Sequence, residues 1–485
     1  MKREIVLLIF FVVVFIVLWV VFYPLIYAIH DEAAYMSQAY VMRTGTIFGD
    51  VAGINVVSSV ETRGGHLVTK YAPGASFLLI PFTFFGWKTI FLLPLILHLL
   101  GFFVFIKILR IYNISPYFSL FYLLYPASVL YSRTIMSDLP SAVFFTIALY
   151  FFLRGRKLHF LSGFFFGVLL LFRYSNVILL MPFFVYLVVD LFKKWQKNYF
   201  LKSSFFRVSI CFFPGFLVFL LYNKFAFGGF LRTSYYIAGM FSLHFFARNL
   251  LFYSLSLSLM FPLMLFSIFS HKRDKFVLTS VVVLFALFYS LISSLAVAPG
   301  RRLAETLVVG MRYLLPVIPI FILSYSVCLE RIKEKRPILG NLFFWFVVGM
   351  FFIFDVIMVY KHQGFLKQQE EYKNTIYNNT EEKSLVLTNY DGMEFFQPVW
   401  GKRQIGMFVY WKDRVPIDFS KCDFNKLYLL TVIRSDKEGN EYVNKYADEI
   451  IKEYNGETVA EIKGDPELRL WKLHYESETG KTEYR

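Results

Sequence analysis

Three carboxylates in the first 359 residues have a type and placement that could support chemistry. Asp31 and Glu32 follow the first long apolar run within a few residues, and Asp138 opens a later apolar run. Carboxylates at such boundaries can accept a proton from an acceptor, hydrogen-bond sugar hydroxyls or bind a metal. The alternative for each is a structural role at a helix start, where an acid caps the backbone or meets the positive end of the helix. Both interpretations stay open on the residues alone.

Arginines form a second group. Arg301 and Arg302 follow a Pro-Gly pair, and Arg312 begins an apolar run. A guanidinium group is planar, offers paired donors and stays charged, so three of them suit a phosphate. The alternative is that these side chains extend to phospholipid headgroups. Arg312 directly adjoins its apolar run, which favours the phosphate interpretation most strongly at that position.

Single polar residues elsewhere give weaker indications. The long segment 27–88 contains His66, a candidate base, metal ligand or sugar contact, and Lys70, a candidate partner of a lipid phosphate. Isolated loop residues of these types more often have no such role. Arg232 lies just after a Gly-Gly pair, with Lys224 just before it. These two residues either line a substrate groove or mark a membrane interface.

The composition indicates which elements must position these residues. The chain of 485 residues is 57% hydrophobic and only 17% charged, against about 45–50% apolar and about 25% charged in ordinary soluble domains. We expect a polytopic α-helical membrane protein, since a membrane helix needs about 20 apolar residues. A short apolar stretch, 75–86, is expected to be interfacial or re-entrant. The eleven expected spans are 5–26, 89–109, 115–132, 137–153, 158–172, 174–191, 208–227, 250–270, 276–296, 312–329 and 338–359.

The basic residues give the expected orientation. The net charge is +16, and with a cytoplasmic N-terminus the segments predicted to lie inside hold 19 of the Lys and Arg residues before position 360, against 12 elsewhere. This asymmetry follows the positive-inside rule. Topology and attraction to anionic headgroups therefore explain the basic charge better than nucleic-acid binding does. Eleven spans place the segment 27–88 in the first outer loop and residues 360–485 outside.

The chain thus divides into a membrane domain, 1–359, and a soluble domain, 360–485. In the second, extended runs at 384–388, 427–433, 459–462 and 468–473 alternate with a helical stretch at 440–454, which predicts a small α/β domain. The three cysteines give neither a disulfide framework nor a zinc pattern. Phosphate-binding Gly-rich loops and the common hydrolase motifs do not occur, so nucleotide-driven transport is unsupported.

At this level of detail the chain resembles the membrane-embedded C-type glycosyltransferases, which include protein O-mannosyltransferases and lipid A aminoarabinose transferases. The resemblance extends over residues 1–330 and depends on the order of several short elements. They are Asp31-Glu32 with Tyr35 following, Pro73-Gly74, Ser137-Asp138-Leu139-Pro140, Gly163 and Gly167 with Arg173-Tyr174, Tyr222-Asn223 with Phe227-Gly228, and Arg312-Tyr313 with Pro316 and Pro319.

The resemblance implies a sugar donor on a polyprenyl phosphate, used at the non-cytoplasmic face of a plasma membrane, with transfer to a glycan, lipid or protein acceptor. It implies catalytic roles for Asp31, Glu32 and Asp138 and substrate binding near Tyr35, with His66 and Arg232 as further candidates. Arg301, Arg302, Arg312 and Lys70 are the expected phosphate ligands. The family usually has Lys near position 173, where this chain has Arg, so the role of Arg173 stays open.

A metal requirement is undecided: Asp31 and Asp138 would favour Mg²⁺ or Mn²⁺ by ligand type. Two other functions compete with the transferase. A flippase or transporter of polyprenyl-linked glycans predicts charged or broken helices near the membrane midplane, whereas these acids and arginines lie at the outer boundary. A non-catalytic cell-envelope assembly protein predicts that Asp31 and Asp138 are dispensable.

Overall fold

The structure is a computed structural model of the chain. It describes residues 2–27, 29–49, 59–62, 65–193, 200–234, 241–262, 264–267, 274–292, 303–388, 403–407, 409–410, 413–414, 419, 424–434, 441–464 and 467–475. The chain forms two compact units. The larger consists of Met1–Pro24 and Lys70–Gln363, and the smaller of Leu25–Thr69 and Gly364–Arg485. The boundary predicted at 359/360 falls inside one continuous helix, α16 (Pro337–Asn379), whose residues are divided between both units.

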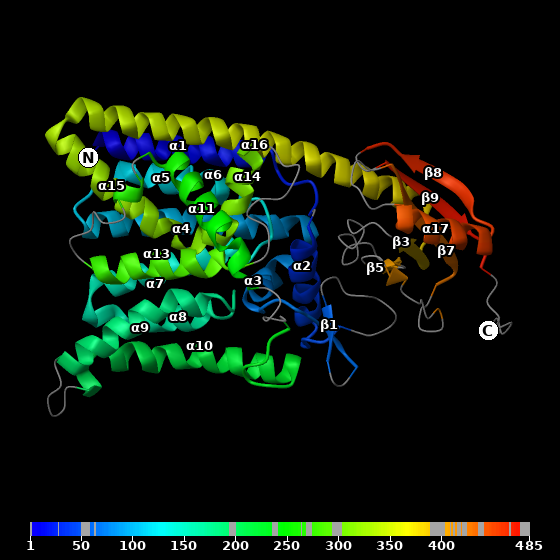
Figure 1. Cartoon of the computed structure of the whole chain (residues 1–485), viewed down its shortest axis with the longest axis horizontal. Coiled ribbons are helices and arrows are strands. Elements are labelled where there is room, and N and C mark those ends of the chain that lie inside the picture. The colour runs from blue at the N-terminus through cyan, green and yellow to red at the C-terminus, as the bar shows by residue number, and fades with distance from the viewer. Residues whose placement is uncertain are drawn as a thin grey trace. The chain divides into compact units, whose positions relative to one another are not determined.

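The larger unit is a bundle of helices (Figure 1). Besides part of α16, its α-helices are α1 (Lys2–Val21), α3 (Gly74–Thr83), α4 (Leu92–Ile111), α5 (Leu120–Leu123), α6 (Pro126–Tyr131), α7 (Asp138–Arg154), α8 (His159–Leu169), α9 (Asn176–Lys193), α10 (Ser204–Phe227), α11 (Phe246–Met260), α12 (Met264–Ser267), α13 (Lys275–Ser290), α14 (Leu303–Val309) and α15 (Ile318–Lys335). Short 3₁₀-helices join them at Trp87–Phe91, Pro116–Ser119, Arg156–Leu158, Phe200–Lys202, Leu243–Phe245 and, as η7, Gly310–Val317.

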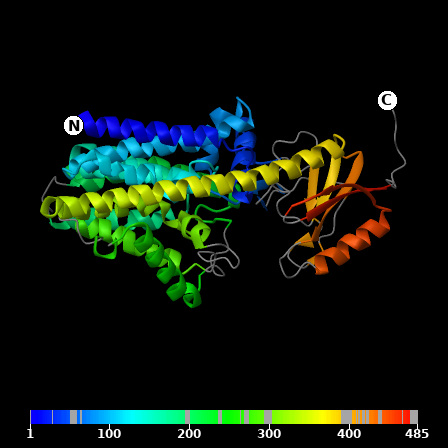
Figure 2. The ribbon, with the colours of Figure 1, turned by 90° about the horizontal axis from the view of Figure 1, so that it is seen from above.

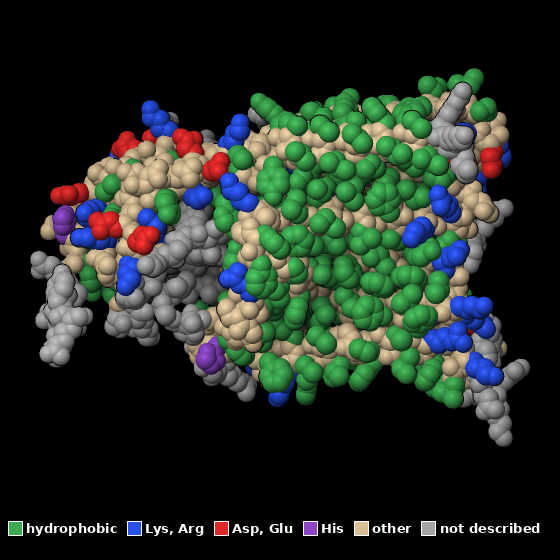
Figure 3. Space-filling view, turned by 180° about the vertical axis from the view of Figure 1, so that it is seen from behind, with side chains coloured by type: hydrophobic (Ala, Val, Ile, Leu, Met, Phe, Trp, Pro, Cys, Tyr) green, Lys and Arg blue, Asp and Glu red, His purple; other side chains and the backbone are tan. Residues whose placement is uncertain are grey.

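Six helices among the described residues are long and apolar enough to cross a membrane: Glu4–Val21, Trp87–Ile111, Asn176–Lys193, Ser204–Phe227, Thr306–Lys335 and Pro337–Asn379. All six coincide with expected spans, and the chain is a multi-pass membrane protein. A broad hydrophobic surface covers the bundle, and Lys and Arg side chains gather at the end where α1 begins (Figure 3). The total of eleven spans stays a prediction, because the other five expected spans coincide with shorter helices.

The expected spans 115–132 and 250–270 are not single helices; the second divides into α11 and α12. Residues 115–132 form a 3₁₀-helix, α5 and α6 in succession. Pro116 and Pro126 each stand at the first turn of one of these helices. Proline favours that position and disfavours the helical conformation in the residue before it. The segment therefore breaks before Pro126, and the expectation of one continuous helix was wrong.

Glycines allow α8 and α10 to pack backbone against backbone. A Cβ atom added at Gly167 would lie 2.4 Å from the carbonyl oxygen of Phe212, and one at Gly215 would lie 2.4 Å from the backbone of Gly167. Small residues permit this close approach between membrane helices. The same packing fixes α8, whose C-terminal end leads into the turn that carries Arg173.

The smaller unit contains α2 (His30–Arg43), a hairpin of β1 (Ser59–Glu61) and β2 (Leu67–Thr69), and a C-terminal α/β fold. Its five-stranded sheet has the order β4-β3-β7-β9-β8, in which β3 is parallel to β4 and β7, and β9 is antiparallel to β7 and β8. The bounds are β3 Ser384–Thr388, β4 Gln404–Met407, β7 Lys426–Arg434, β8 Glu457–Ile462 and β9 Glu467–Leu473; β5 (Val409–Tyr410) and β6 (Asp413–Arg414) form a separate pair.

Helix α17 (Glu441–Glu453) covers one face of this sheet (Figure 2). Alternate strand residues, such as Leu385 and Leu387, meet Ala447 and Ile450 of the helix in a buried cluster. This is the pattern expected for a strand with one face buried and a helix with one apolar stripe. The four strands and the helix predicted in this region are confirmed; β4, β5 and β6 were not predicted.

Candidate active site

A buried ion pair lies at the start of α7. Asp138 is the first residue of that helix, and its carboxylate accepts a hydrogen bond from Nη1 of Arg173, in the turn between α8 and α9. The side chains of Asp138 and Arg173 are only 4% and 14% exposed. No cap bond is made by the residue before Asp138, Ser137. The carboxylate therefore holds a cation, which goes beyond the structural role at a helix start considered above.

Two tyrosines support the arginine of this pair. The Arg173 guanidinium carbon lies 5.6 Å from the ring centroid of Tyr289, on α13, and 5.5 Å from that of Tyr313, on η7. The two rings stack on each other at 5.2 Å, and Tyr289 Oη lies 2.6 Å from Ser175 Oγ. Aromatic faces attract a guanidinium group. Burial disfavours the charge of Arg173, but the neighbouring Asp138 carboxylate outweighs this effect, so the pKa of Arg173 is raised above its usual value.

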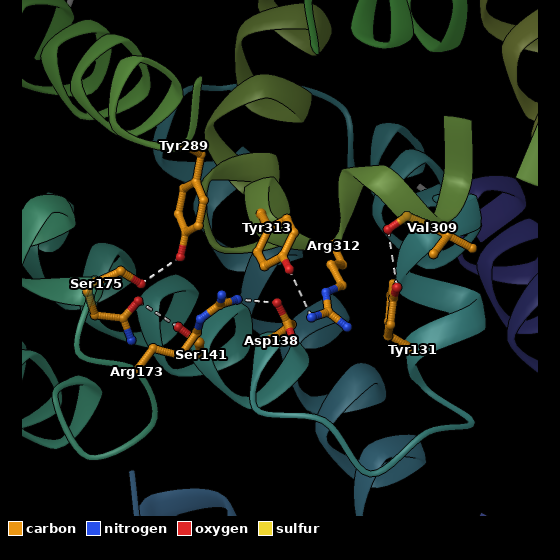
Figure 4. Close-up of polar contacts among 10 residues, drawn as sticks. Tyr131, Asp138, Ser141, Arg173, Ser175, Tyr289, Val309, Arg312 and Tyr313 are labelled. Carbon is orange, nitrogen blue, oxygen red and sulfur yellow. Dashed lines mark hydrogen bonds and ion pairs between the residues drawn. The ribbon is translucent and has the colours of Figure 1, made fainter. Parts of the chain in front are cut away.

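A second arginine joins the same cluster. Arg312 Nη2 donates to Tyr313 Oη at 3.0 Å, and its guanidinium carbon lies 4.7 Å from that ring's centroid (Figure 4). Arg312 is half-buried and interacts electrostatically with Arg173. Among the described residues of this cluster, two guanidinium groups thus face one carboxylate. Two guanidinium groups close together in a partly buried place suit an anion, and a phosphate in particular.

The turn that carries Arg173 is fixed by buried polar contacts. Ser141 Oγ donates to Asn176 Oδ1 at 2.9 Å, and Asn176 Nδ2 donates to the Leu169 carbonyl at 2.8 Å. The Gly74 amide donates to the Leu171 carbonyl at 2.6 Å, and a Cβ atom at Gly74 would lie 2.7 Å from that oxygen. The start of α7, the α8–α9 turn and the start of α3 are therefore tied together around the ion pair.

The cluster does not provide a divalent metal site. Within the described part of the chain, no group of three His, Cys, Asp or Glu side chains could hold a metal ion. Asp138 already accepts from Arg173, and Arg312 adds a second positive charge nearby. A donor set of one engaged carboxylate between guanidinium groups does not fit Mg²⁺ or Mn²⁺, which need several oxygen ligands.

The acidic pair predicted in the first outer loop lies at the start of α2, in the smaller unit. Asp31 is half-buried, whereas Glu32 is 2% exposed. Glu32 interacts with the buried hydroxyl of Tyr27, and burial together with this carboxylate raises the pKa of Tyr27. Tyr35, a candidate substrate contact, is 3% exposed. Of these residues Asp31 is the least buried.

The remaining predicted site residues differ in environment. His66 is exposed beside Phe48, with ring centroids 5.2 Å apart. Lys70 is half-buried with its Nζ 5.3 Å from the Tyr71 ring, and its carbonyl accepts from Ser234 Oγ at 2.5 Å. Arg232 is exposed in the turn after α10. Arg301 and Arg302 lie outside the described residues.

The larger unit thus brings together Asp138 and Arg312, both candidates from the sequence, with Arg173, whose role was open. Tyr289 and Ser175 were missed. Tyr289 is one of 32 tyrosines, and no spacing distinguishes it from the others. Arg173, a cation at the end of an apolar run, was a detectable signal, but its partner could not be identified without the turn geometry.

No protein-family model and no curated protein sequence matches the chain. Solved structures do match it. ArnT from Cupriavidus metallidurans in the apo state is similar with a TM-score of 0.66 and 14% identity, over 97% of this chain and 98% of ArnT. ArnT bound to undecaprenyl phosphate gives a TM-score of 0.65 at 14% identity, over 96% and 97% of the two chains. The Archaeoglobus fulgidus oligosaccharyltransferase in the apo form gives 0.49 at 12% identity, over 90% and 70%. The chain therefore has the fold of ArnT, which is the C-type glycosyltransferase fold expected from its sequence.

Proposed function

We propose that this protein is a membrane glycosyltransferase that moves a sugar from a polyprenyl-phosphate donor to an acceptor hydroxyl at the extracytoplasmic face. The observation that carries the proposal is the cluster of Arg173, Arg312 and Asp138 on stacked tyrosines, in which two guanidinium groups lie close together. The fold shared with ArnT, which has been solved with undecaprenyl phosphate bound, supports a lipid phosphate as the ligand.

In this proposal the donor phosphate binds at Arg312, with Lys70, Arg301 and Arg302 as further ligands. A guanidinium that is already oriented by Tyr313 can stabilise the negative charge that grows on the leaving phosphate. Arg173 adds positive electrostatic potential at the phosphate, and its bond to Asp138 keeps it in place. Asp138 accordingly acts as a positioning residue for Arg173, because one of its carboxylate oxygens is engaged by that side chain.

The proton of the acceptor needs a separate base. We assign this role to Asp31, because its neighbour Glu32 is buried beside Tyr27 whereas Asp31 is half-buried. As the acceptor oxygen bonds to the anomeric carbon, its proton passes to the Asp31 carboxylate. The bond from the anomeric carbon to the phosphate oxygen breaks, and its electron pair leaves with polyprenyl phosphate. This single displacement inverts the anomeric centre.

The test uses purified protein in lipid nanodiscs with a panel of polyprenyl-phosphate sugars, and measures the release of free polyprenyl phosphate. Asp31→Asn is expected to lower the rate by about 100-fold or more, the usual range for loss of a general base. Asp190→Asn is the matched control. Asp190 lies near the opposite end of α9 from the cluster, 3.8 Å from Arg156, and its variant is expected to keep the wild-type rate.

Near-normal release from Asp31→Asn would remove Asp31 as the base. The absence of release from every donor, by folded protein that still binds lipid phosphate, would contradict the transferase and favour transport of a polyprenyl-linked glycan.

A further inference from the structure

A fully buried arginine lies outside the cluster described above. Arg133, in the segment between α6 and α7, is 1% exposed. Its Nη2 donates to Gln363 Oε1 at 2.7 Å, while Nε and Nη1 have no hydrogen-bond partner among the described residues. Burial lowers the pKa of Arg133 to about 10. Burying a guanidinium with most of its donors unpaired costs free energy that an apolar side chain would not.

The bonds around Arg133 join distant parts of the chain. Gln363, on α16, donates from Nε2 to the Tyr23 carbonyl at 3.2 Å. The residue before Arg133, Ser132, accepts at its carbonyl from Trp19 Nε1 at 3.0 Å. One short network therefore fixes the end of α1 and a point on α16 to the same segment of backbone.

These are the two places where the chain leaves the larger unit, which ends at Pro24 and again at Gln363. The segment that follows Tyr23 leads to Asp31, and the segment that follows Arg133 leads to Asp138. In addition, Tyr131 Oη donates to the Val309 carbonyl at 3.2 Å, immediately before η7, which carries Arg312 (Figure 4). The residues around Arg133 thus connect the end of α1, a point on α16, the segment that leads to Asp138 and the start of η7.

From this arrangement we propose that Arg133 is a positioning residue: through Gln363 it fixes the end of α1 against the backbone segment that leads to Asp138. The inference rests on the proposed function. This role also explains why a cation, Arg133, is buried at a place where an apolar side chain would leave no donor unpaired. Buried polar groups of this kind can specify one arrangement at a cost in stability.

The test compares wild type with the double variant Arg133→Met/Gln363→Met, with Arg133→Lys, and with Gln368→Met as the matched control. Gln368 lies on the same helix and its Nε2 donates to Tyr372 Oη at 2.7 Å, apart from the network. Three quantities are measured for the full chain in nanodiscs: the thermal midpoint of unfolding, hydrogen exchange by mass spectrometry, and kcat and KM for the donor.

We expect the double variant to keep or raise the thermal midpoint and to keep KM for the donor, because the phosphate ligands are untouched. Its kcat falls about 10- to 100-fold, the loss typical of misplaced catalytic groups, and exchange rises in residues 132–140 and at the end of α1. Arg133→Lys recovers part of kcat, since it retains a charged donor. The Gln368→Met control matches wild type.

Wild-type kcat in the double variant would overturn the proposal, as would a loss of kcat that only follows a loss of folded protein. If no donor is turned over even by wild type, the proposed function fails, and hydrogen exchange then decides alone. Greater exchange confined to these segments supports the positioning role, and unchanged exchange overturns it.

Discussion

The two ends of the larger unit each hold a cluster of charged residues and tyrosines. Near the start of α1, Lys333 Nζ donates to Tyr117 Oη at 2.7 Å and lies 4.6 Å from that ring's centroid, and Ser115 Oγ donates to Glu4 at 2.5 Å. At the other end, Arg173 and Arg312 lie on stacked tyrosines around Asp138.

The clusters differ in balance and in burial. In the Lys333 cluster, Lys333 and Glu4 each form a hydrogen bond with the segment 115–117. These bonds fasten the ends of α15 and α1. In the Arg173 cluster, two guanidinium groups face one carboxylate among the described residues, and the ion pair is almost fully buried. Fastening helix ends does not require two neighbouring guanidinium groups, whereas their paired donors suit a phosphate.

The largest expected difference between the two ends concerns stability. Asp138→Leu leaves Arg173 buried without its carboxylate, which should lower the free energy of unfolding by about 3–5 kcal/mol. Replacing the pair together, with Asp138→Leu/Arg173→Met, should recover most of this loss. At the other end, Glu4→Gln should cost about 1 kcal/mol, the net value of one hydrogen bond.

Denaturant titration in mixed micelles measures these three differences. If the single and double variants at Asp138 are equally unstable, the two side chains do not act as a pair.

The next effect concerns catalysis. Arg312→Met should lower kcat/KM for the donor about 100-fold, near the loss found on removing one charge-stabilising donor from an active site. Lys333→Met, the same loss of a cation at the opposite end, should change kcat/KM by less than about 3-fold, since Lys333 contacts Tyr117 and shares no partner with the described residues of the proposed phosphate site. Release of polyprenyl phosphate under steady-state conditions measures both, and equal losses in the two variants would remove the functional distinction between the ends.

A smaller effect is expected from the tyrosine hydroxyls. Tyr313→Phe removes the oxygen that accepts from Arg312 but keeps the stacked ring, so kcat/KM should fall about 5- to 10-fold, within the net contribution of one ordinary hydrogen bond. Tyr117→Phe removes the corresponding acceptor of Lys333 and should leave kcat/KM unchanged. The pair of variants is compared in the same release assay, and a larger loss from Tyr117→Phe would reverse the comparison.

Much of the fold could be predicted from the sequence because its signals are local. Long apolar runs predicted all six of the long membrane helices, and alternating residues predicted β3, β7, β8 and β9. Two errors were also local. Pro126 was visible as a helix start, and the buried positions Leu366, Tyr372 and Ile376 continue a helical spacing that extends α16 beyond its predicted end.

The site was predicted only in part, because its geometry is not local. The residue types of Asp138 and Arg312 predicted a charged site at one boundary of the membrane. The bond from Arg173 to Asp138 depends on the α8–α9 turn lying against the start of α7, through contacts such as Ser141 with Asn176. Arg133 drew no attention in the sequence, because a single arginine between two apolar runs looks like an interface residue until its burial is known.

The most direct test of the central claim measures the affinity of undecaprenyl phosphate for wild type, Arg312→Met and Lys333→Met in detergent, by titration calorimetry at constant salt. If the Arg173 cluster binds the donor phosphate, Arg312→Met should weaken binding about 10- to 100-fold, the value of a charge-assisted bond of about 1.5–3 kcal/mol. Lys333→Met should bind undecaprenyl phosphate as wild type does. Equal affinity of all three proteins would contradict the account.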